Sequence, residues 1–173
     1  NVTKVSEYIL ACRNMGIGIL PPDINEGVSG FSVSGNSIRY GLSAIKSVGR
    51  AVVDVIISER ETGGPFSTLE DFVSRMSNRE VNKRTLESFI KSGSLDSLPG
   101  TRKQKLYVSS ELLENKAREK KTVMEGQMSF FDIAPEEDKG NFQVSFPDVG
   151  EFDKETLLAF EKETLGIYVS GHP

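Results

Sequence analysis

The sequence predicts a mainly α-helical fold: two helical hairpins in tandem, with a short β-hairpin before them and a flexible acidic linker after them. Apolar residues recur at helical spacing through most of the chain. Capping residues and glycines divide that pattern into short helices, and acidic residues collect towards the C-terminal end. Of the 173 residues, 37% are hydrophobic and 27% charged, so modest cores joined by polar segments are expected.

The N-terminal region is expected to contain one helix, an extended stretch and the β-hairpin. Thr3 can cap a helix that ends near Gly16. The apolar stripe of this helix would comprise Val5, Tyr8, Ile9 and Cys12. The Pro-Pro pair that follows cannot continue a helix. Alternating apolar residues on both sides of Gly35-Asn36, a favoured two-residue turn, predict the β-hairpin.

The first helical hairpin is predicted within "GLSAIKSVGRAVVDVIISER". A helix from Gly41 and a second helix would be joined by a very short turn centred on Val48-Gly49-Arg50. Gly49 permits a tight, positive-φ turn without a Cβ clash. Free backbone N–H groups at the start of the second helix, together with the helix dipole, suit a phosphate oxygen. The candidate DNA-binding residues of this turn are Lys46, Ser47, Val48, Gly49 and Arg50.

The second helical hairpin repeats this plan further along the chain. Ser67 and Glu70 form a capping box that would open its first helix, and Gly93 would end its second. Its candidate DNA-binding residues are Asn78, Arg79, Asn82, Lys83 and Arg84. Neither turn offers a pattern that reads base edges, so sequence-independent binding to the phosphate backbone is expected. The alternative is that both turns only connect packed helices and face solvent.

The C-terminal third should hold two helices separated by a linker. Thr101 and Gln104 form another capping box, which opens a basic helix towards Lys121. Residues 126–150 are rich in acids and in Pro and Gly breaks, which predicts little fixed structure. A short helix over residues 154–163 then precedes "LGIYVSGHP", which is typical of a strand cut short. We therefore expect the chain to be a piece of a longer protein.

Charge is distributed unevenly along the chain. Residues 101–121 hold 7 Lys and Arg against 3 Asp and Glu, whereas residues 122–163 hold 3 against 11. This segregation indicates either a polyanion-binding half and an acidic spacer, or a solvated basic helix beside a disordered linker. A single Cys and a single His exclude a disulfide framework and do not supply a zinc site. Because a disulfide framework is impossible, a cytoplasmic protein is the simplest expectation, and no apolar run approaches the length of a membrane span.

One stretch of the acidic linker, "VMEGQMSFFDIAPEEDKG", contains large apolar residues with no evident core to bury them. An extended peptide of this kind can offer aromatic anchors to a pocket on a partner, with a Gln supplying oriented hydrogen bonds. The residues taken alone favour a different interpretation, in which Met128, Phe130 and Phe131 pack back onto the preceding helix.

Four motifs resemble a known family: "YILACRNMGIGILPPDIN", "IRYGLSAIKSVG", "FIKSGSLDSL" and "ETLGIYVSGHP". They are similar to the alpha subunit of bacterial DNA polymerase III, the C-family of replicative polymerases, through nearly the whole chain and in family order. The resemblance implies five regions: the end of the fingers (1–37), a tandem helix-hairpin-helix DNA-binding domain (38–98), a basic helix (99–122), a linker with a clamp-binding motif (123–150) and the start of an oligonucleotide-binding fold (151–173).

The resemblance also implies partners for the linker and for the hairpins. "QMSFF" fits the family's motif for binding the beta sliding clamp, which assigns that role to Gln127, Met128, Ser129, Phe130 and Phe131. The other expected partners are the primer–template duplex and further subunits of the replicase. The parent would be a DNA-directed DNA polymerase that uses magnesium in its palm. Because the palm aspartates lie outside this chain, we expect neither a cofactor nor activity here. Two alternatives remain open: a helix-hairpin-helix module of a repair enzyme, and a helical scaffold that does not bind DNA.

Overall fold

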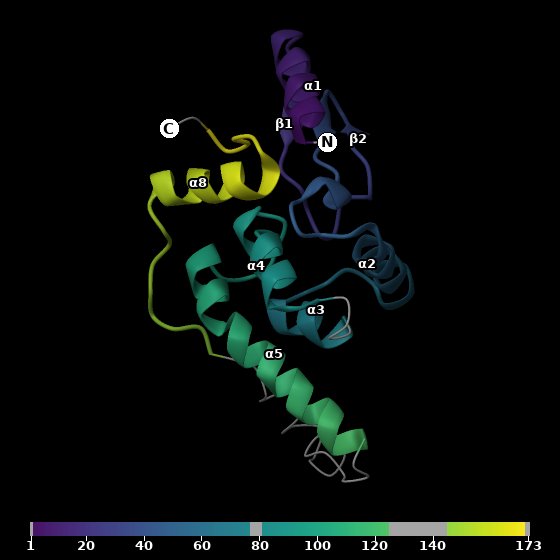
Figure 1. Ribbon diagram of the computed structural model, residues 1–173, viewed down its shortest axis with the longest axis vertical. Coiled ribbons are helices and arrows are strands. Elements are labelled where there is room, and N and C mark those ends of the chain that lie inside the picture. The colour runs from purple at the N-terminus through teal and green to yellow at the C-terminus, as the bar shows by residue number, and fades with distance from the viewer. Residues whose placement is uncertain (1, 77–80, 125–144, 172–173) are drawn as a thin grey trace.

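The computed structural model describes residues 2–76, 81–124 and 145–171 (Figure 1). Within these ranges the fold is mainly α-helical, as the sequence predicts, with one small sheet. The N-terminal helix and the sheet lie at one end of an elongated molecule, and a long helix projects from the other end. Two short helical hairpins lie between these ends, and the last helix packs beside them.

The N-terminal unit contains α1 (Val2–Asn14) and three strands, β1 (Gly18–Leu20), β2 (Ser32–Ser34) and β3 (Ser37–Arg39). The strand order is β1-β3-β2, with β2 antiparallel and β1 parallel to β3. The predicted β-hairpin is thus confirmed, and Gly35 makes its turn with a φ of 62°. The stretch predicted only as extended chain supplies the third strand.

The first helix departs from its predicted pattern at two residues. It begins at Val2, so Thr3 lies inside the helix instead of capping it. Tyr8 is 56% exposed, whereas Ile9 is 1% exposed and Cys12 is buried. The helix is short and only one narrow stripe faces the sheet, so Tyr8 falls outside the buried face. Gly16, at a φ of 79°, follows the end of the helix as expected.

The first helical hairpin is less symmetric than predicted. The helix expected from Gly41 is a single 3₁₀ turn, η1 (Leu42–Ala44), followed by extended chain and then by α2 (Arg50–Gly63). This first helix is short because of a hydrogen bond to the last helix of the chain. The Lys46 N–H, which in a longer helix would bond to the Leu42 carbonyl, donates to the Thr164 carbonyl at 2.9 Å.

The second helical hairpin contains α3 (Leu69–Arg75) and α4 (Lys83–Lys91). Its predicted capping box is displaced by one residue. Thr68, not Ser67, caps α3 by accepting the Asp71 N–H at 3.0 Å, and the Asp71 carboxylate accepts the Ser67 N–H at 3.0 Å. Both adjacent hydroxyl residues have an acidic residue three positions later, so the local pattern fits either register.

The last two helices are α5 (Arg102–Met124) and α8 (Lys154–Leu165). The capping box that opens α5 is confirmed, because Thr101 N–H donates to Gln104 at 2.9 Å and Gln104 N–H donates to Thr101 at 3.1 Å. The strand predicted after α8 does not form over residues 166–171. The buried Glu161 carboxylate instead accepts the backbone N–H groups of Val169 and Ser170, at 2.9 and 3.0 Å.

Helix α4 lies at the centre of the core. Leu86, Phe89 and Ile90 are each fully buried, and the Phe89 ring meets the Phe72 ring edge to face at 5.6 Å. Helices α3, α5 and α8 surround α4 (Figure 1). The core therefore joins both helical hairpins to the C-terminal helices.

Buried polar groups hold the C-terminal helices in place. Arg102 pairs with Asp96 at 2.8 Å and with Glu161 at 3.3 Å, and the Lys105 ammonium donates to the carbonyls of Leu95 and Leu98 at 2.6 and 3.0 Å. Burial lowers the pKa of Lys105. Two charges of the predicted basic helix thus lie inside the protein and add little to an external positive field.

Tyr40 connects the end of the sheet to the last turn of α8. Its side chain is buried, and its hydroxyl donates to the Leu165 carbonyl at 2.8 Å. Burial raises the pKa of Tyr40 to about 12. The raised pKa means that the folded state holds the phenol proton more tightly than the unfolded state does.

Tyr40→Phe is expected to lower the free energy of unfolding by about 1–2 kcal/mol at neutral pH, because the Leu165 carbonyl loses its donor. The contribution of a group with a raised pKa is present below its unfolded value of 10.0 and is lost as the pH rises through about 12. Urea unfolding of both proteins across this range measures the effect. The difference between them should shrink with rising pH, and a constant difference would contradict the assignment.

Candidate nucleic-acid interface

The first candidate turn, residues 46–50, has an unexpected backbone. Ser47 has a φ of 68° and is the one non-glycine residue with positive φ among those the structure describes. Gly49, predicted to take that role, has φ −82° and ψ 158°, which any residue can adopt. The prediction that Gly49 has a positive φ is therefore wrong. Val48 is buried and anchors the turn, while its four neighbours are exposed.

Gly49 caps α2 without a side-chain hydrogen bond, which leaves the first turn of that helix open. The Gly49 carbonyl accepts the Val53 N–H, but in the described part of the chain no acceptor faces the N–H groups of Arg50, Ala51 and Val52. A Cβ atom placed on Gly49 would meet nothing within 4 Å. The fold thus leaves room for a side chain at this position, and glycine leaves the N–H groups at the start of α2 more open than a larger residue would.

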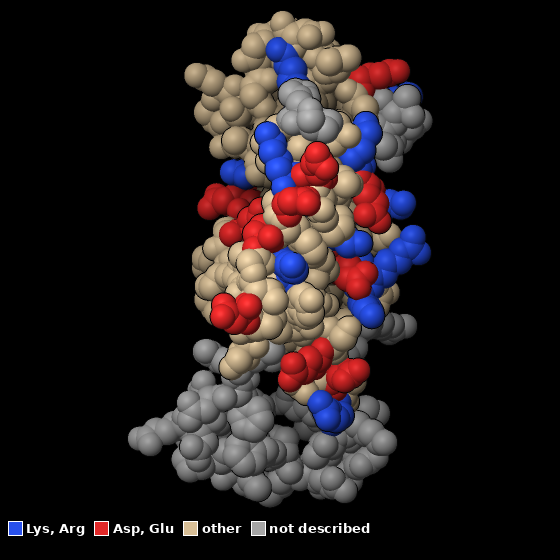
Figure 2. Space-filling view, turned by 90° about the vertical axis from the view of Figure 1, so that its left-hand side faces the viewer, with Lys and Arg blue, Asp and Glu red and all other residues tan. Residues whose placement is uncertain are grey.

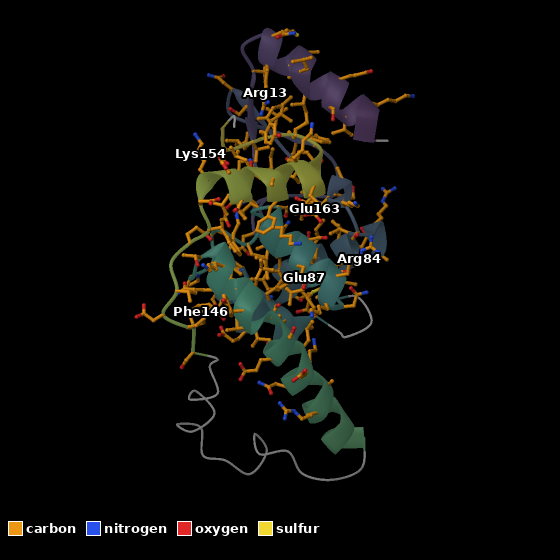
Figure 3. All side chains as sticks on the ribbon, turned by 60° about the vertical axis from the view of Figure 1, so that its left-hand side comes forward. Arg13, Arg84, Glu87, Phe146, Lys154 and Glu163 are labelled. Atoms are coloured by element: carbon orange, nitrogen blue, oxygen red, sulfur yellow. The ribbon has the colours of Figure 1, made fainter. Side chains whose placement is uncertain are left out.

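The second candidate turn is described only in part. Asn78 and Arg79 lie outside the described residues. Asn82 caps α4 by accepting the Thr85 N–H at 2.9 Å, so it fixes the helix end and leaves less of its side chain for a ligand. Lys83 and Arg84 are exposed in the first turn of α4, and Arg84 points away from the body of the protein (Figure 3).

The structure brings the two turns together. The Thr85 hydroxyl oxygen lies 3.4 Å from the Ser47 carbonyl oxygen and joins the start of α4 to the first turn. Residues 46–50 and 82–84, here called the two-turn surface, are therefore neighbours. Thr85 itself was missed in the sequence. The available signal was its place three residues after the Asn82 cap, where a hydroxyl can reach beyond its own helix.

The four basic side chains of the two-turn surface are Lys46, Arg50, Lys83 and Arg84. They form no ion pairs with the described residues of the protein. Arg75, by contrast, pairs with Asp71 at 3.2 Å. The face in Figure 2 intersperses Lys and Arg with Asp and Glu and offers no field of one sign. On this face, the charge segregation of the sequence therefore does not produce a positive surface.

An open groove borders the two-turn surface, between the start of α4 and the outer side of α5. Asn82 and Lys83 line one side, and Ser110, Leu113 and Glu114 line the other. The Glu114 carboxylate disfavours a phosphate in this groove. We place the edge of the candidate interface at Lys83.

The predicted clamp-binding residues, Gln127, Met128, Ser129, Phe130 and Phe131, lie outside the described residues. The structure does describe the helix that leads to them. Helix α5 projects from the body of the protein (Figure 1). Its residues 114, 115, 117 and 118 are exposed. The end of the predicted linker, residues 145–150, packs back on the start of α5, where the Gln104 amide donates to the Pro147 carbonyl at 3.1 Å.

Neither a metal cluster nor a membrane span is found among the described residues. No group of three or more His, Cys, Asp or Glu side chains there could hold a metal ion. None of the helices in this part of the chain is both long and apolar enough to cross a membrane.

The fold and its paired turns define a helix-hairpin-helix protein. A family model described as "Helix-hairpin-helix motif" matches residues 16–105, more than half of the chain, and the chain belongs to this family.

Over its whole length the chain is also similar to alpha subunits of DNA polymerase III. It is 42% identical to that of Borreliella burgdorferi over 173 residues, 42% identical to that of Thermus aquaticus over 170 and 38% identical to that of Mycobacterium leprae over 170. These alignments cover 100%, 98% and 98% of the chain but only 15%, 13% and 14% of the relatives. The resemblance that the motifs indicate is thereby confirmed.

Ser47→Gly is expected to raise the free energy of unfolding by about 0.5–1 kcal/mol, because a left-handed residue with a Cβ is strained and glycine is not. Thermal unfolding of the 173-residue chain measures this change. Ser47→Ala keeps the strain and serves as the matched control. A stabilisation by Ala equal to that by Gly would show that the side chain, not the backbone, is responsible.

Proposed function

We propose that this chain binds the phosphate backbone of duplex DNA through the two-turn surface, as part of the alpha subunit of a bacterial replicative DNA polymerase. The observation that carries the proposal is the meeting of an open helix start at Gly49 with four exposed cations on adjacent turns. The family model and the names of the relatives support it. Those names also favour a polymerase over a repair enzyme.

The chemistry of this surface suits phosphate and not bases. Backbone N–H groups at the start of α2 can donate to a phosphate oxygen, and the helix dipole favours the negative charge. Lys46, Arg50, Lys83 and Arg84 add charge around that point. Such contacts fix the position of a duplex without reading its sequence. Binding should therefore be sequence-independent and should weaken steeply with salt.

Gly49→Ala is the sharpest test, because the added methyl group meets nothing in the protein. We expect unchanged stability and a loss of duplex affinity of about tenfold, since the methyl group blocks close approach of a phosphate to the N–H groups. Fluorescence anisotropy with two duplexes of unrelated sequence, over a salt series, measures both affinity and its salt dependence.

Gly30→Ala is the matched control. Gly30 is also exposed, has no atom within 4 Å of a Cβ position and lies outside the two-turn surface. It should bind duplex as the unchanged protein does. Equal affinities of the two variants would contradict a phosphate site at Gly49.

We further propose that "QMSFF" tethers the parent polymerase to its sliding clamp. The family's motif and the exposed, projecting α5 support this role. A tethered polymerase re-engages its primer end faster than it diffuses away, because tethering raises the effective concentration. The parent would be a DNA-directed DNA polymerase with magnesium in a palm outside this chain, and this chain alone would be inactive.

A chain with Gln127, Phe130 and Phe131 all changed to Ala should lose clamp binding, because buried aromatic anchors contribute on the order of 2 kcal/mol or more each. Calorimetric titration with the beta clamp measures this loss. Duplex binding by the same variant should be unchanged, since the two-turn surface is intact. Undiminished clamp affinity would contradict this role and favour the alternative, in which these residues pack on the preceding helix.

A further inference from the structure

A single, nearly buried hydroxyl lies between the two turns of the interface. Thr85 is 6% exposed, and its Oγ1 is 3.4 Å from the Ser47 carbonyl oxygen and 3.0 Å from the Asn82 side-chain oxygen. In the part of the chain described, it makes the one hydrogen-bond contact between residues 46–50 and 82–85. The hydroxyl thus lies within reach of both the cap of α4 and the backbone of the first turn, and the contact with the cap is the shorter one.

Both acceptors of this hydroxyl are structurally constrained. The Asn82 oxygen also accepts the Thr85 N–H at 2.9 Å, which fixes the start of α4. The Ser47 carbonyl belongs to the residue held at a φ of 68°. A change at Thr85 therefore acts on the first turn and on the helix end together, and it removes no exposed cation.

We propose that Thr85 is a positioning residue that couples the two turns, so that they bind one duplex backbone as a single unit. This inference rests on the proposed function. Phosphates along a duplex have a fixed spacing, so a second turn contributes fully only when it is held in register with the first. With the register loosened, each turn meets the backbone independently and the second contributes less.

Two substitutions at Thr85 distinguish the effect of its hydroxyl group from the effect of its packing. Thr85→Val removes the hydroxyl and keeps the shape, whereas Thr85→Ser keeps the hydroxyl and loses a methyl group. We expect Thr85→Val to weaken duplex binding by about 2- to 10-fold and Thr85→Ser to retain the original affinity. The slope of log affinity against log salt should fall by about 0.9 for each phosphate that the Thr85→Val variant no longer neutralises. A merely structural role, measured while the protein stays folded, would not change this slope.

A double-mutant cycle tests the coupling directly. One pair of changes, Lys46→Gln with Arg50→Gln, removes the charge of the first turn. The other, Lys83→Gln with Arg84→Gln, removes that of the second. In the original and Thr85→Ser backgrounds the combined loss of affinity should be smaller than the product of the two separate losses. In the Thr85→Val background the losses should multiply.

The outcomes distinguish this inference from the function on which it rests. If the unchanged chain shows no salt-dependent duplex binding, the proposed function itself fails. If it binds, but Thr85→Val leaves affinity and salt slope unchanged, or Thr85→Ser behaves as Thr85→Val does, the positioning role is overturned. If Thr85→Val does not fold, the cycle in the unchanged protein decides, because independent losses there would exclude coupling between the turns.

Discussion

The burial of α4 is the constraint on which the rest of the structure depends. Its Leu86, Phe89 and Ile90 side chains are fully enclosed. Helices α5 and α8 pack against it, and α3 contacts it through the Phe72 ring. The same short helix begins at the exposed Asn82 cap. The part of the proposed interface at residues 82–84 is thus the end of a deeply buried helix and not a loop. A surface built in this way changes its geometry only when the core itself repacks.

Polar groups inside the protein carry a second part of the architecture. Asp96, Arg102 and Glu161 link the loop after α4, the start of α5 and the middle of α8. Glu161 also accepts the N–H groups of the chain after α8, so its buried charge is satisfied from several directions. Counting charges along the sequence overestimates the external positive field, because it treats such residues as surface residues.

The sequence predicts those features whose causes are local. The Thr101 capping box and the Gly35 turn are set by neighbouring residues and are found as predicted. The shortened first helix is not, because the Lys46 N–H finds its acceptor at Thr164, far away in the chain. The sequence predicts a positive φ at Gly49, because glycine tolerates it, but in the structure Ser47 has the positive φ. The contact of Thr85 with Ser47 depends on how two hairpins pack, which no local pattern records.

The empty space beside Gly49 has a consequence for protein engineering. Nothing in the fold fills the place of a Cβ atom there. An alanine would restrict the unfolded chain more than glycine does but is a poorer N-cap residue, so the two effects on stability oppose each other. Directed evolution for heat resistance alone would therefore accept alanine at this position. It would yield an equally stable protein in which one methyl group closes the proposed phosphate site, and only a screen that includes duplex DNA would detect the loss.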